Sequence, residues 1–199
     1  MHRSLELRYI KFYKPYEVLC QFSASQNRLT LQDFIPVPEI YPAGRLDYRS
    51  EGMLLLTNDP ATIHRLTSPK FHHPKTYLVQ VEGEISDQAR RSLQKVDLLP
   101  GVQTKPAAVE IIPQANLPPR PRPVRDYHPT SWLRITLCEG KKHQIRRMTA
   151  AVGFPTLRLV RVSIAGLTLG DLQPGEWCDL SAEEIARLDS QLRMPVSIK

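Results

Sequence analysis

The fold of this chain is decided by residues 44–57, which read GRLDYRSEGMLLLT. The first nine residues are polar except Leu46 and have a glycine at each end, a composition that predicts a loop. The last five form a short continuous apolar run, which is typical of a buried strand. Catalytic groups often lie on loops held by a rigid core, so Asp47 is a candidate functional carboxylate. Arg45 and Arg49 would keep it ionised. The alternative is an aspartate that closes an Asx turn.

Strands and helices are mixed on both sides of this loop. Apolar patterns predict extended segments over residues 9–13, 18–22, 75–81, 109–112, 132–138, 155–160 and 168–172. We expect a short helical turn over 30–34 and helices over 61–66, 86–96, 142–152 and from 181 onward, with Asp59 and Ser86 as N-caps. Residues 117–129 combine five prolines with three arginines and predict an extended basic loop. Because several strands adjoin through short turns, we expect an α+β fold with a mixed, mostly antiparallel sheet flanked by helices.

The composition is that of a soluble globular chain. Its 199 residues are 41% hydrophobic and 24% charged. No apolar run approaches the roughly 18 residues of a membrane span, so we expect no membrane-spanning helix. Three distant cysteines, Cys20, Cys138 and Cys178, form no C-x-x-C pattern, which favours buried thiols in a reducing cytoplasm. We expect one two-lobed domain over residues 8–192 and a loose tail over 193–199.

No motif in the chain indicates a cofactor or a metal. The glycine-rich patterns of dinucleotide and P-loop nucleotide sites are missing from the sequence. His72 and His73 are adjacent, and no other residue near them has the spacing of a metal ligand. We therefore predict neither a metal site nor a cofactor.

Positive charge gathers in one part of the chain. The net charge is +7, and residues 134–161 contain seven basic residues against one acid. Within this segment, residues 139–148 read EGKKHQIRRM. Lys141 and Lys142 would stand near a helix N-terminus, where an anionic ligand such as phosphate relieves their repulsion by the helix dipole. We expect a nucleic acid as partner, the alternative being a solvated basic face.

The motifs occur in an order that resembles a known enzyme family. Besides residues 44–57 and 139–148, the resemblance includes Lys14-Pro15-Tyr16, Lys75-Thr76-Tyr77 and the closing segment 167–177. Together these segments are similar to the catalytic domain of pseudouridine synthases, in the RsuA-like branch of ribosomal enzymes. Because the lysine-proline element starts at residue 14, we expect the chain to lack the small N-terminal RNA-binding domain common in this branch.

This resemblance implies isomerisation of uridine within RNA to pseudouridine, in a basic cleft and without a cofactor. The target base must be extruded from folded RNA to reach a carboxylate. Asp47 matches the catalytic aspartate, acting either as a nucleophile on the sugar or as a base for a sugar proton. Arg146 matches the arginine that pairs with this aspartate. Tyr77 matches the tyrosine that stacks on uracil and is the candidate for proton transfer at carbon 5. The alternatives, judged without the resemblance, are a core strand aromatic for Tyr77 and a surface ion pair with Glu139 for Arg146.

The same matches imply which residues bind the RNA. Ile145 would pack against the uracil, and Arg45 would occupy the vacated stack or bind a neighbouring phosphate. The expected phosphate contacts, which would make binding depend on salt, are Lys75, Lys141, Lys142 and Arg147.

The partner that the resemblance implies is structured ribosomal RNA, in particular that of the large subunit (23S). We expect a cytoplasmic monomer with no membrane partner. The target uridine stays open, as does the choice between naked RNA and an assembly particle. Three other hypotheses compete: a non-catalytic ribosomal-RNA-binding or ribosome-assembly protein that retains the fold, a duplex-DNA-binding protein, and a glycoside hydrolase that uses Asp47 and Glu51.

Overall fold

The computed structural model describes residues 6–99, 102–124 and 127–193. Its strands are β1 (Tyr9–Lys14), β2 (Val18–Leu19), β3 (Leu29–Thr30), β4 (Tyr41–Pro42), β5 (Glu51–Thr57), β6 (Lys75–Glu82), β7 (Asp97–Leu99), β8 (Val102–Gln103), β9 (Ala108–Ile112), β10 (Thr130–Leu137), β11 (Thr156–Ile164), β12 (Leu167–Thr168) and β13 (Trp177–Asp179). Its helices are α1 (Pro60–Thr67), α2 (Asp87–Leu93), α3 (Gln144–Ala151) and α4 (Ala182–Arg193), with short 3-10 helices at Leu31–Asp33 and Pro69–Phe71. Within those residues, no helix is long and apolar enough to cross a membrane.

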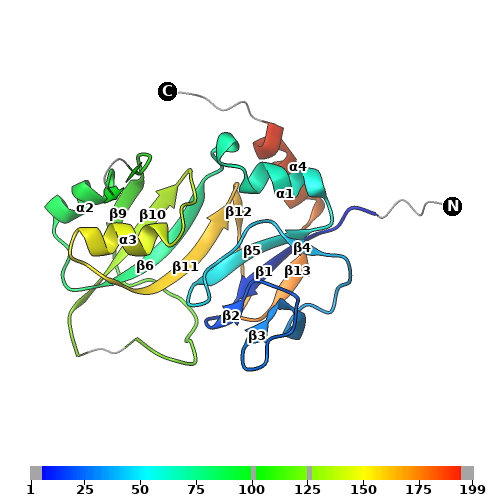
Figure 1. Cartoon of the computed structure of the whole chain (residues 1–199), viewed down its shortest axis with the longest axis horizontal. Coiled ribbons are helices and arrows are strands. Elements are labelled where there is room, and N and C mark those ends of the chain that lie inside the picture. The colour runs from blue at the N-terminus through cyan, green and yellow to red at the C-terminus, as the bar shows by residue number, and fades with distance from the viewer. Residues whose placement is uncertain (1–5, 100–101, 125–126, 194–199) are drawn as a thin grey trace.

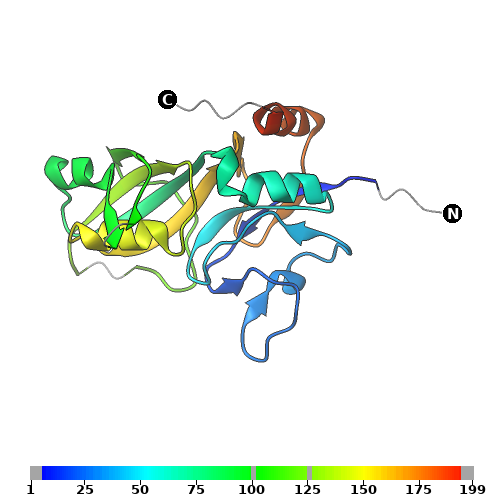
Figure 2. The same cartoon turned by 45° about the horizontal axis from the view of Figure 1, so that its top comes forward.

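One long sheet runs through the whole molecule (Figure 1). Its strand order is β13-β1-β5-β11-β6-β10-β9, with β4 beside β5 and β12 beside β11. The pairs along this order are antiparallel except that of β5 with β11, which is parallel. The predicted α+β class, with a mixed and mostly antiparallel sheet, is therefore confirmed. Figure 2 shows α2 and α3 beside one half of this sheet and α1 and α4 beside the other.

The parallel pair of β5 and β11 is the seam between the two halves of the sheet. Gly52 lies at this seam, opposite Lys14 on β1 and Arg161 on β11. Its φ is +104°, and a Cβ added there would lie 2.2 Å from the carbonyl oxygen of Arg161. Both the positive φ and the close approach of the neighbouring backbone require glycine. The glycine that ends the predicted loop is thus the second residue of β5, where it allows β11 to approach closely.

The core explains why β5 is apolar without interruption. Every residue of β5 is buried, because both faces of the strand are covered. Met53 and Leu55 pack in a cluster with α1 and α4, whereas Leu54 and Leu56 pack in a second cluster closed by residues 31–40. A third cluster packs α2 and α3 against β6, β9 and β10.

Several element boundaries differ from the prediction. The differences are that β5 begins at Glu51 instead of 53, α2 ends at Leu93 instead of 96, α3 begins at Gln144 instead of 142, and β11 continues to Ile164 instead of 160. The expected extended segment 168–172 is strand only at Thr168, and Trp177–Asp179 forms an unpredicted strand on the edge of the sheet. Strands are extended or created by pairing partners that are distant in sequence, which a local pattern does not reveal.

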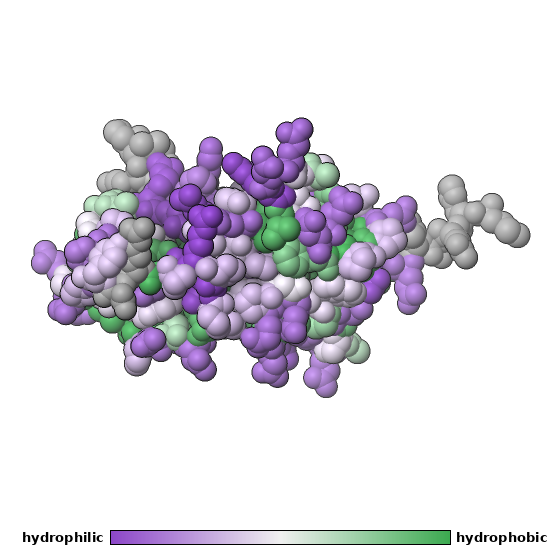
Figure 3. Space-filling view, turned by 90° about the horizontal axis from the view of Figure 1, so that it is seen from below, coloured by the Kyte–Doolittle hydropathy of each residue, from purple (hydrophilic) through white to green (hydrophobic). Residues whose placement is uncertain are grey.

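The segment of prolines and arginines forms no helix or strand in its described residues, 117–124 and 127–129. It runs along the underside of the molecule, where Figure 1 draws it at the lower left. Seen from below, this face is mostly hydrophilic, with smaller apolar areas between (Figure 3). At the other end of the chain α4 includes Arg193, the first residue of the expected tail, and residues 194–199 lie outside the described part.

Candidate active site

A cleft of about 670 Å³ is bordered by residues 43–50, by β6 and β11, and by the turn that precedes α3. Seven of the predicted site residues line it: Arg45, Asp47, Lys75, Tyr77, Lys141, Lys142 and Ile145. The other two, Arg146 and Arg147, are on the first turn of α3, next to the lining residue Ile145. The lining contains five Lys and Arg residues but two carboxylates, those of Asp47 and Glu139. Residues more than 90 positions apart in the chain thus meet in one basic cleft.

A buried lysine at the end of β1 supports the loop that carries Asp47. Lys14 is fully buried at the end of β1, and its Nζ donates to the carbonyl oxygens of Pro15 at 2.7 Å and Val18 at 2.9 Å. It also lies 3.5 Å from the carbonyl oxygen of Tyr48, the residue after Asp47. Burial lowers the pKa of Lys14 to about 8. Within the loop, the Ser50 amide donates to the Asp47 carbonyl at 2.9 Å, which closes the turn through the backbone.

A thiol anchors the same loop on its other side. The amide of Leu46 donates to Sγ of Cys20 at 3.3 Å. Burial raises the pKa of the Cys20 thiol, so the sulfur stays protonated and acts as a weak acceptor. The backbone on both sides of Asp47 is therefore attached to the core, while the carboxylate is left for the cleft.

The Asp47 carboxylate contacts a histidine. Its Oδ1 lies 3.4 Å from Nε2 of His143, and both side chains are partly exposed to the cleft. The expected contact with Arg146 is not formed in this structure. Instead Arg146 donates to the carbonyl oxygens of Arg49 at 2.8 Å and Thr156 at 3.3 Å. Burial lowers the pKa of Arg146, and the negative charge of Asp47 acts against this shift, so the two groups still interact electrostatically.

The RNA pseudouridylate synthase family matches residues 8–151, the segment that builds this cleft up to the end of α3. The chain belongs to this family. Its relatives include "Ribosomal large subunit pseudouridine synthase E" of Vibrio vulnificus (strain CMCP6), 53% identical over 179 residues, which covers 88% of this chain and 76% of the relative. The protein of the same name from Xanthomonas campestris pv. campestris is 48% identical over 169 residues, covering 82% and 90%.

More distant members of the family also match this chain over most of its length. "Ribosomal small subunit pseudouridine synthase A" of Escherichia coli (strain K12) is 37% identical over 190 residues, covering 90% of this chain and 73% of the relative. A solved structure described as "Crystal structure of pseudouridylate synthase" superimposes with a TM-score of 0.78 at 31% identity, over 92% of this chain and 74% of that one. The chain is therefore a pseudouridine synthase in fold and family.

In this pseudouridine synthase a buried polar network shapes the turn before α3. Glu139 accepts from the Gln144 side chain at 2.6 Å and from the amide of Lys105 at 2.9 Å. Gln144 in turn accepts from the amide of Lys141 at 2.9 Å. His143 has a φ of +52°, so the turn ends in a left-handed residue and α3 starts only at Gln144. The expected start of α3 at 142 is wrong for this reason, and Glu139 is a buried part of the turn instead of a surface partner of Arg146.

The opposite wall of the cleft comes from β6. Tyr77 lines the cleft and also packs against the cluster that contains Ile145, so it combines the core position and the site position that were considered as alternatives. Lys75 lies two positions earlier on the same face of the strand, and its Nζ donates to the His73 carbonyl at 3.2 Å. Burial, and next the positive charge of Arg161, lower the pKa of Lys75 to about 8.

Glu51 is not part of this site. Its carboxylate is buried and makes a bidentate pair with Arg158, at 3.0 Å to Nε and 2.9 Å to Nη2. Arg120 adds a second positive group at 3.7 Å. A carboxylate bound in this way is not available to share a sugar with Asp47, so the hypothesis of a glycosidase pair is wrong.

Sequence reasoning did not nominate every residue of the cleft, and His143 and Arg161 are the two omissions that matter for its chemistry. Both lie in the basic segment 134–161, and His143 is inside the motif that was singled out, so the signal was present. The sequence pattern does not give the orientation of its side chains, so it did not indicate which basic groups face Asp47. In the described part of the chain, no group of three or more His, Cys, Asp or Glu residues could hold a metal ion.

Proposed function

We propose that this chain isomerises a specific uridine of ribosomal RNA, in particular large-subunit (23S) RNA, to pseudouridine. The observation that carries the proposal is the meeting of Asp47, Tyr77 and Ile145 in one basic cleft. The substrate assignment is supported by relatives of 48–53% identity that are named ribosomal large subunit pseudouridine synthase E. Because such RNA is made and assembled in the cytoplasm of bacteria, we expect the enzyme to work there, as a monomer.

The chemistry needs an ionised carboxylate next to a flat apolar surface. In the reaction the bond from C1′ to N1 breaks, the uracil turns, and a bond from C1′ to C5 forms, while the proton on C5 is lost and one is gained on N1. Asp47 serves this either by attacking C1′ or by removing a sugar proton. Both roles need the charged form of the carboxylate. Tyr77 and Ile145, which both line the cleft, would contact the extruded base.

The cations at the rim of the cleft would position the RNA backbone. Lys141 and Lys142 stand on the turn before α3, and Arg45 precedes Asp47 by two residues. Arg147 follows Arg146 on the first turn of the helix. Phosphate contacts of this kind supply affinity and make it fall with salt, whereas the extruded base decides which nucleotide reacts.

The first test is to incubate the protein with unmodified large-subunit rRNA and to map pseudouridine by chemical tagging and primer extension. Asp47→Asn removes the charge of the carboxylate, and Asp87→Asn, on the exposed start of α2, is the matched control. One new stop with the wild type and the control, absent with Asp47→Asn, supports the proposal. A stop that appears only on ribosomal particles places recognition in the assembly.

The test also separates the second candidate function. Binding to rRNA without a stop on either RNA or particles would favour a non-catalytic ribosomal-RNA-binding or ribosome-assembly protein. Small-subunit rRNA is the necessary comparison, because a relative of 37% identity is named for that subunit. A stop on small-subunit RNA alone would contradict the large-subunit assignment.

A further inference from the structure

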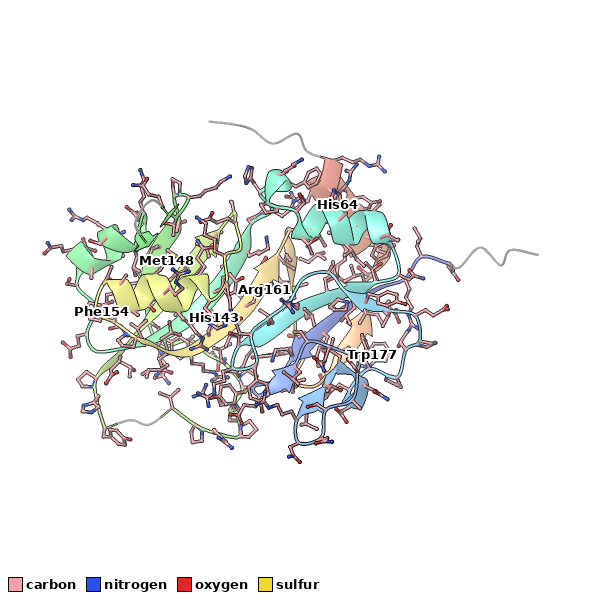
Figure 4. All side chains as sticks on the ribbon, viewed as in Figure 1. His64, His143, Met148, Phe154, Arg161 and Trp177 are labelled. Atoms are coloured by element: carbon pink, nitrogen blue, oxygen red, sulfur yellow. The ribbon has the colours of Figure 1, made fainter. Side chains whose placement is uncertain are left out.

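Arg161 lies at the floor of the cleft with its charge uncompensated. It is 3% exposed, in the middle of β11, and is paired in register with Tyr77 on β6. Its Nε donates to the Met53 carbonyl at 2.8 Å, but its Nη2 is buried and has no hydrogen-bond partner. The residue nevertheless lines the cleft, and Figure 4 shows it between the two halves of the sheet.

A second cation lies beside it. Lys75 is two positions from Tyr77 on β6, and the charge of Arg161 acts directly on it. Within the part of the chain that the structure describes, neither Lys75 nor Arg161 forms an ion pair with a carboxylate. Arg161 is buried and Lys75 is half-buried beside it. A buried charge without a partner is expensive, so such a pair of cations is retained where an anion completes it.

We infer that Arg161 and Lys75 form an anion site for the uracil ring itself, which stabilises the negative charge that the base acquires when its bond to the sugar breaks. The inference rests on the proposed function and deepens it. When the bond from C1′ to N1 breaks, its electron pair stays on the uracil and is shared by N1 and the two carbonyl oxygens. The same pair of electrons is available again when C5 attacks C1′, and nothing is oxidised or reduced.

The position of the two cations favours the base over a phosphate as the anion. Arg161 is opposite Tyr77 and Lys75 is two positions from it. Both cations line the same cleft as Tyr77 and Ile145, the residues expected to hold the uracil ring. The cations suited to phosphates, Lys141 and Lys142, stand instead on the turn that leads into α3. Donors placed in advance where charge develops, in a site sheltered from water, are among the largest contributions to catalysis.

The test measures RNA affinity and single-turnover conversion separately, for Arg161→Gln, Arg161→Lys and Lys75→Gln. We expect the rate at saturating RNA to fall about 100-fold in Arg161→Gln and Lys75→Gln, with RNA affinity changed by less than about threefold. Arg161→Lys keeps the charge and should recover part of the rate. Because Arg161 also holds the Met53 carbonyl, each variant is compared with the wild type by thermal unfolding. Lys75→Gln, which leaves that bond intact, keeps the test decisive if Arg161→Gln fails to fold.

A change in the substrate supplies a readout that a purely structural role would not move. RNA with 5-fluorouridine at the target has a uracil that carries negative charge more easily. The rate of breaking its bond to the sugar, followed by nucleoside mass spectrometry, should therefore depend less on Lys75 and Arg161 than with uridine. An equal loss with both RNAs would overturn the inference.

The remaining outcomes are distinct from one another. Weaker binding with an unchanged rate at saturation would assign the two cations to a phosphate and overturn the uracil site. Unchanged rate and affinity would leave them without a role in the reaction and overturn it as well. No conversion by the wild type on any ribosomal RNA or particle would overturn the proposed function, and the inference with it.

Discussion

Arg158 and Arg161 lie three positions apart on β11, both are buried, and they differ in how their charges are compensated. Arg158 is opposite Gln80 and Arg161 is opposite Tyr77, so the two side chains leave opposite faces of the sheet. Arg158 forms a bidentate pair with Glu51 and donates to the Pro118 carbonyl at 2.7 Å. Arg161 has a backbone carbonyl as partner and a nitrogen without one.

The difference separates Arg158, whose charge is compensated within the protein, from Arg161, whose charge is available to a ligand in the cleft. On the face of Arg158, Arg120 stacks over the ring of Tyr16 at 4.4 Å and approaches Glu51, so the proline-rich segment is attached to the sheet by charge. On the face of Arg161, the positive groups open into a cleft. Because a buried charge is stable only with a partner, the missing partner on the cleft side indicates where an anionic ligand belongs.

The strongest test of this comparison removes the compensation on the structural side. Glu51→Gln keeps the size of the side chain but leaves Arg158 buried without an opposite charge. We expect it to lower the free energy of unfolding by about 3–5 kcal/mol, measured by urea denaturation. The double variant Glu51→Gln/Arg158→Met should recover most of this loss, because an apolar side chain needs no partner. A loss below about 1 kcal/mol would show that Arg158 is solvated and that the comparison fails.

The second prediction concerns the uncompensated side and depends on pH. The pKa of Lys75 is lowered to about 8, mainly by burial and next by Arg161, whereas Cys138 acts in the opposite direction. Below that pH the lysine is charged in both states, and its burial destabilises the fold. Between pH about 8 and the usual value near 10.5, the unfolded chain holds a proton that the folded chain has lost, so this penalty shrinks as pH rises.

Lys75→Met should therefore be more stable than the wild type at pH 7, by about 2 kcal/mol, while it loses activity. The difference should disappear as the pH approaches about 10.5. The measurement is urea denaturation of both proteins between pH 7 and pH 10, and taking the difference removes the contributions of other titrating groups. A variant less stable than the wild type at pH 7 would mean that the charge of Lys75 is compensated after all.

A smaller effect is expected for the histidine that contacts Asp47. His143→Ala removes the 3.4 Å contact without touching the floor of the cleft. We expect about a tenfold lower kcat/KM, because the carboxylate loses the side chain that contacts it in the cleft. His64→Ala, on α1 and away from the cleft lining, is the control. Equal activity of the two variants would assign the orientation of Asp47 to Arg146 alone.

The smallest effect is expected at an exposed ion pair that resembles the pair of Arg158 in distance but not in burial. Arg134 and Glu110 lie 2.7 Å apart on neighbouring strands, with side chains 50% and 60% exposed. Because water screens both charges, Arg134→Ala should change the free energy of unfolding by less than about 0.5 kcal/mol. A loss comparable with that of Glu51→Gln would show that burial does not govern the strength of these pairs.

Local signals in the sequence were sufficient for much of the fold. The apolar run over residues 53–57 predicted a buried strand, and the structure buries every residue of β5. Asp59 and Ser86 cap α1 and α2 through their side chains, as expected from their positions before the helical patterns. These signals work because a cap, a turn and a strand pattern each depend on neighbours within a few residues.

The cleft could be predicted as a set of residues but not as a geometry. The motifs nominated nine residues, and seven of them line the cleft, yet the pattern could not say that His143 and not Arg146 contacts Asp47. That contact depends on the left-handed turn at His143, which a buried network of Glu139 and Gln144 creates. The network closes only after Lys105, 34 positions away from Glu139, is in place.

The sequence by itself determined the family, the order of most elements and the identity of the candidate carboxylate, since each is written in contiguous motifs. Tertiary structure alone decided which buried arginine is neutralised. Strand alternation requires Arg158 and Arg161 to point to opposite faces, but it does not say which face holds a carboxylate. Glu51 lies 107 positions before Arg158 in the chain and neutralises it. The pairing of β5 with β11, which exists only in the folded sheet, brings the two together.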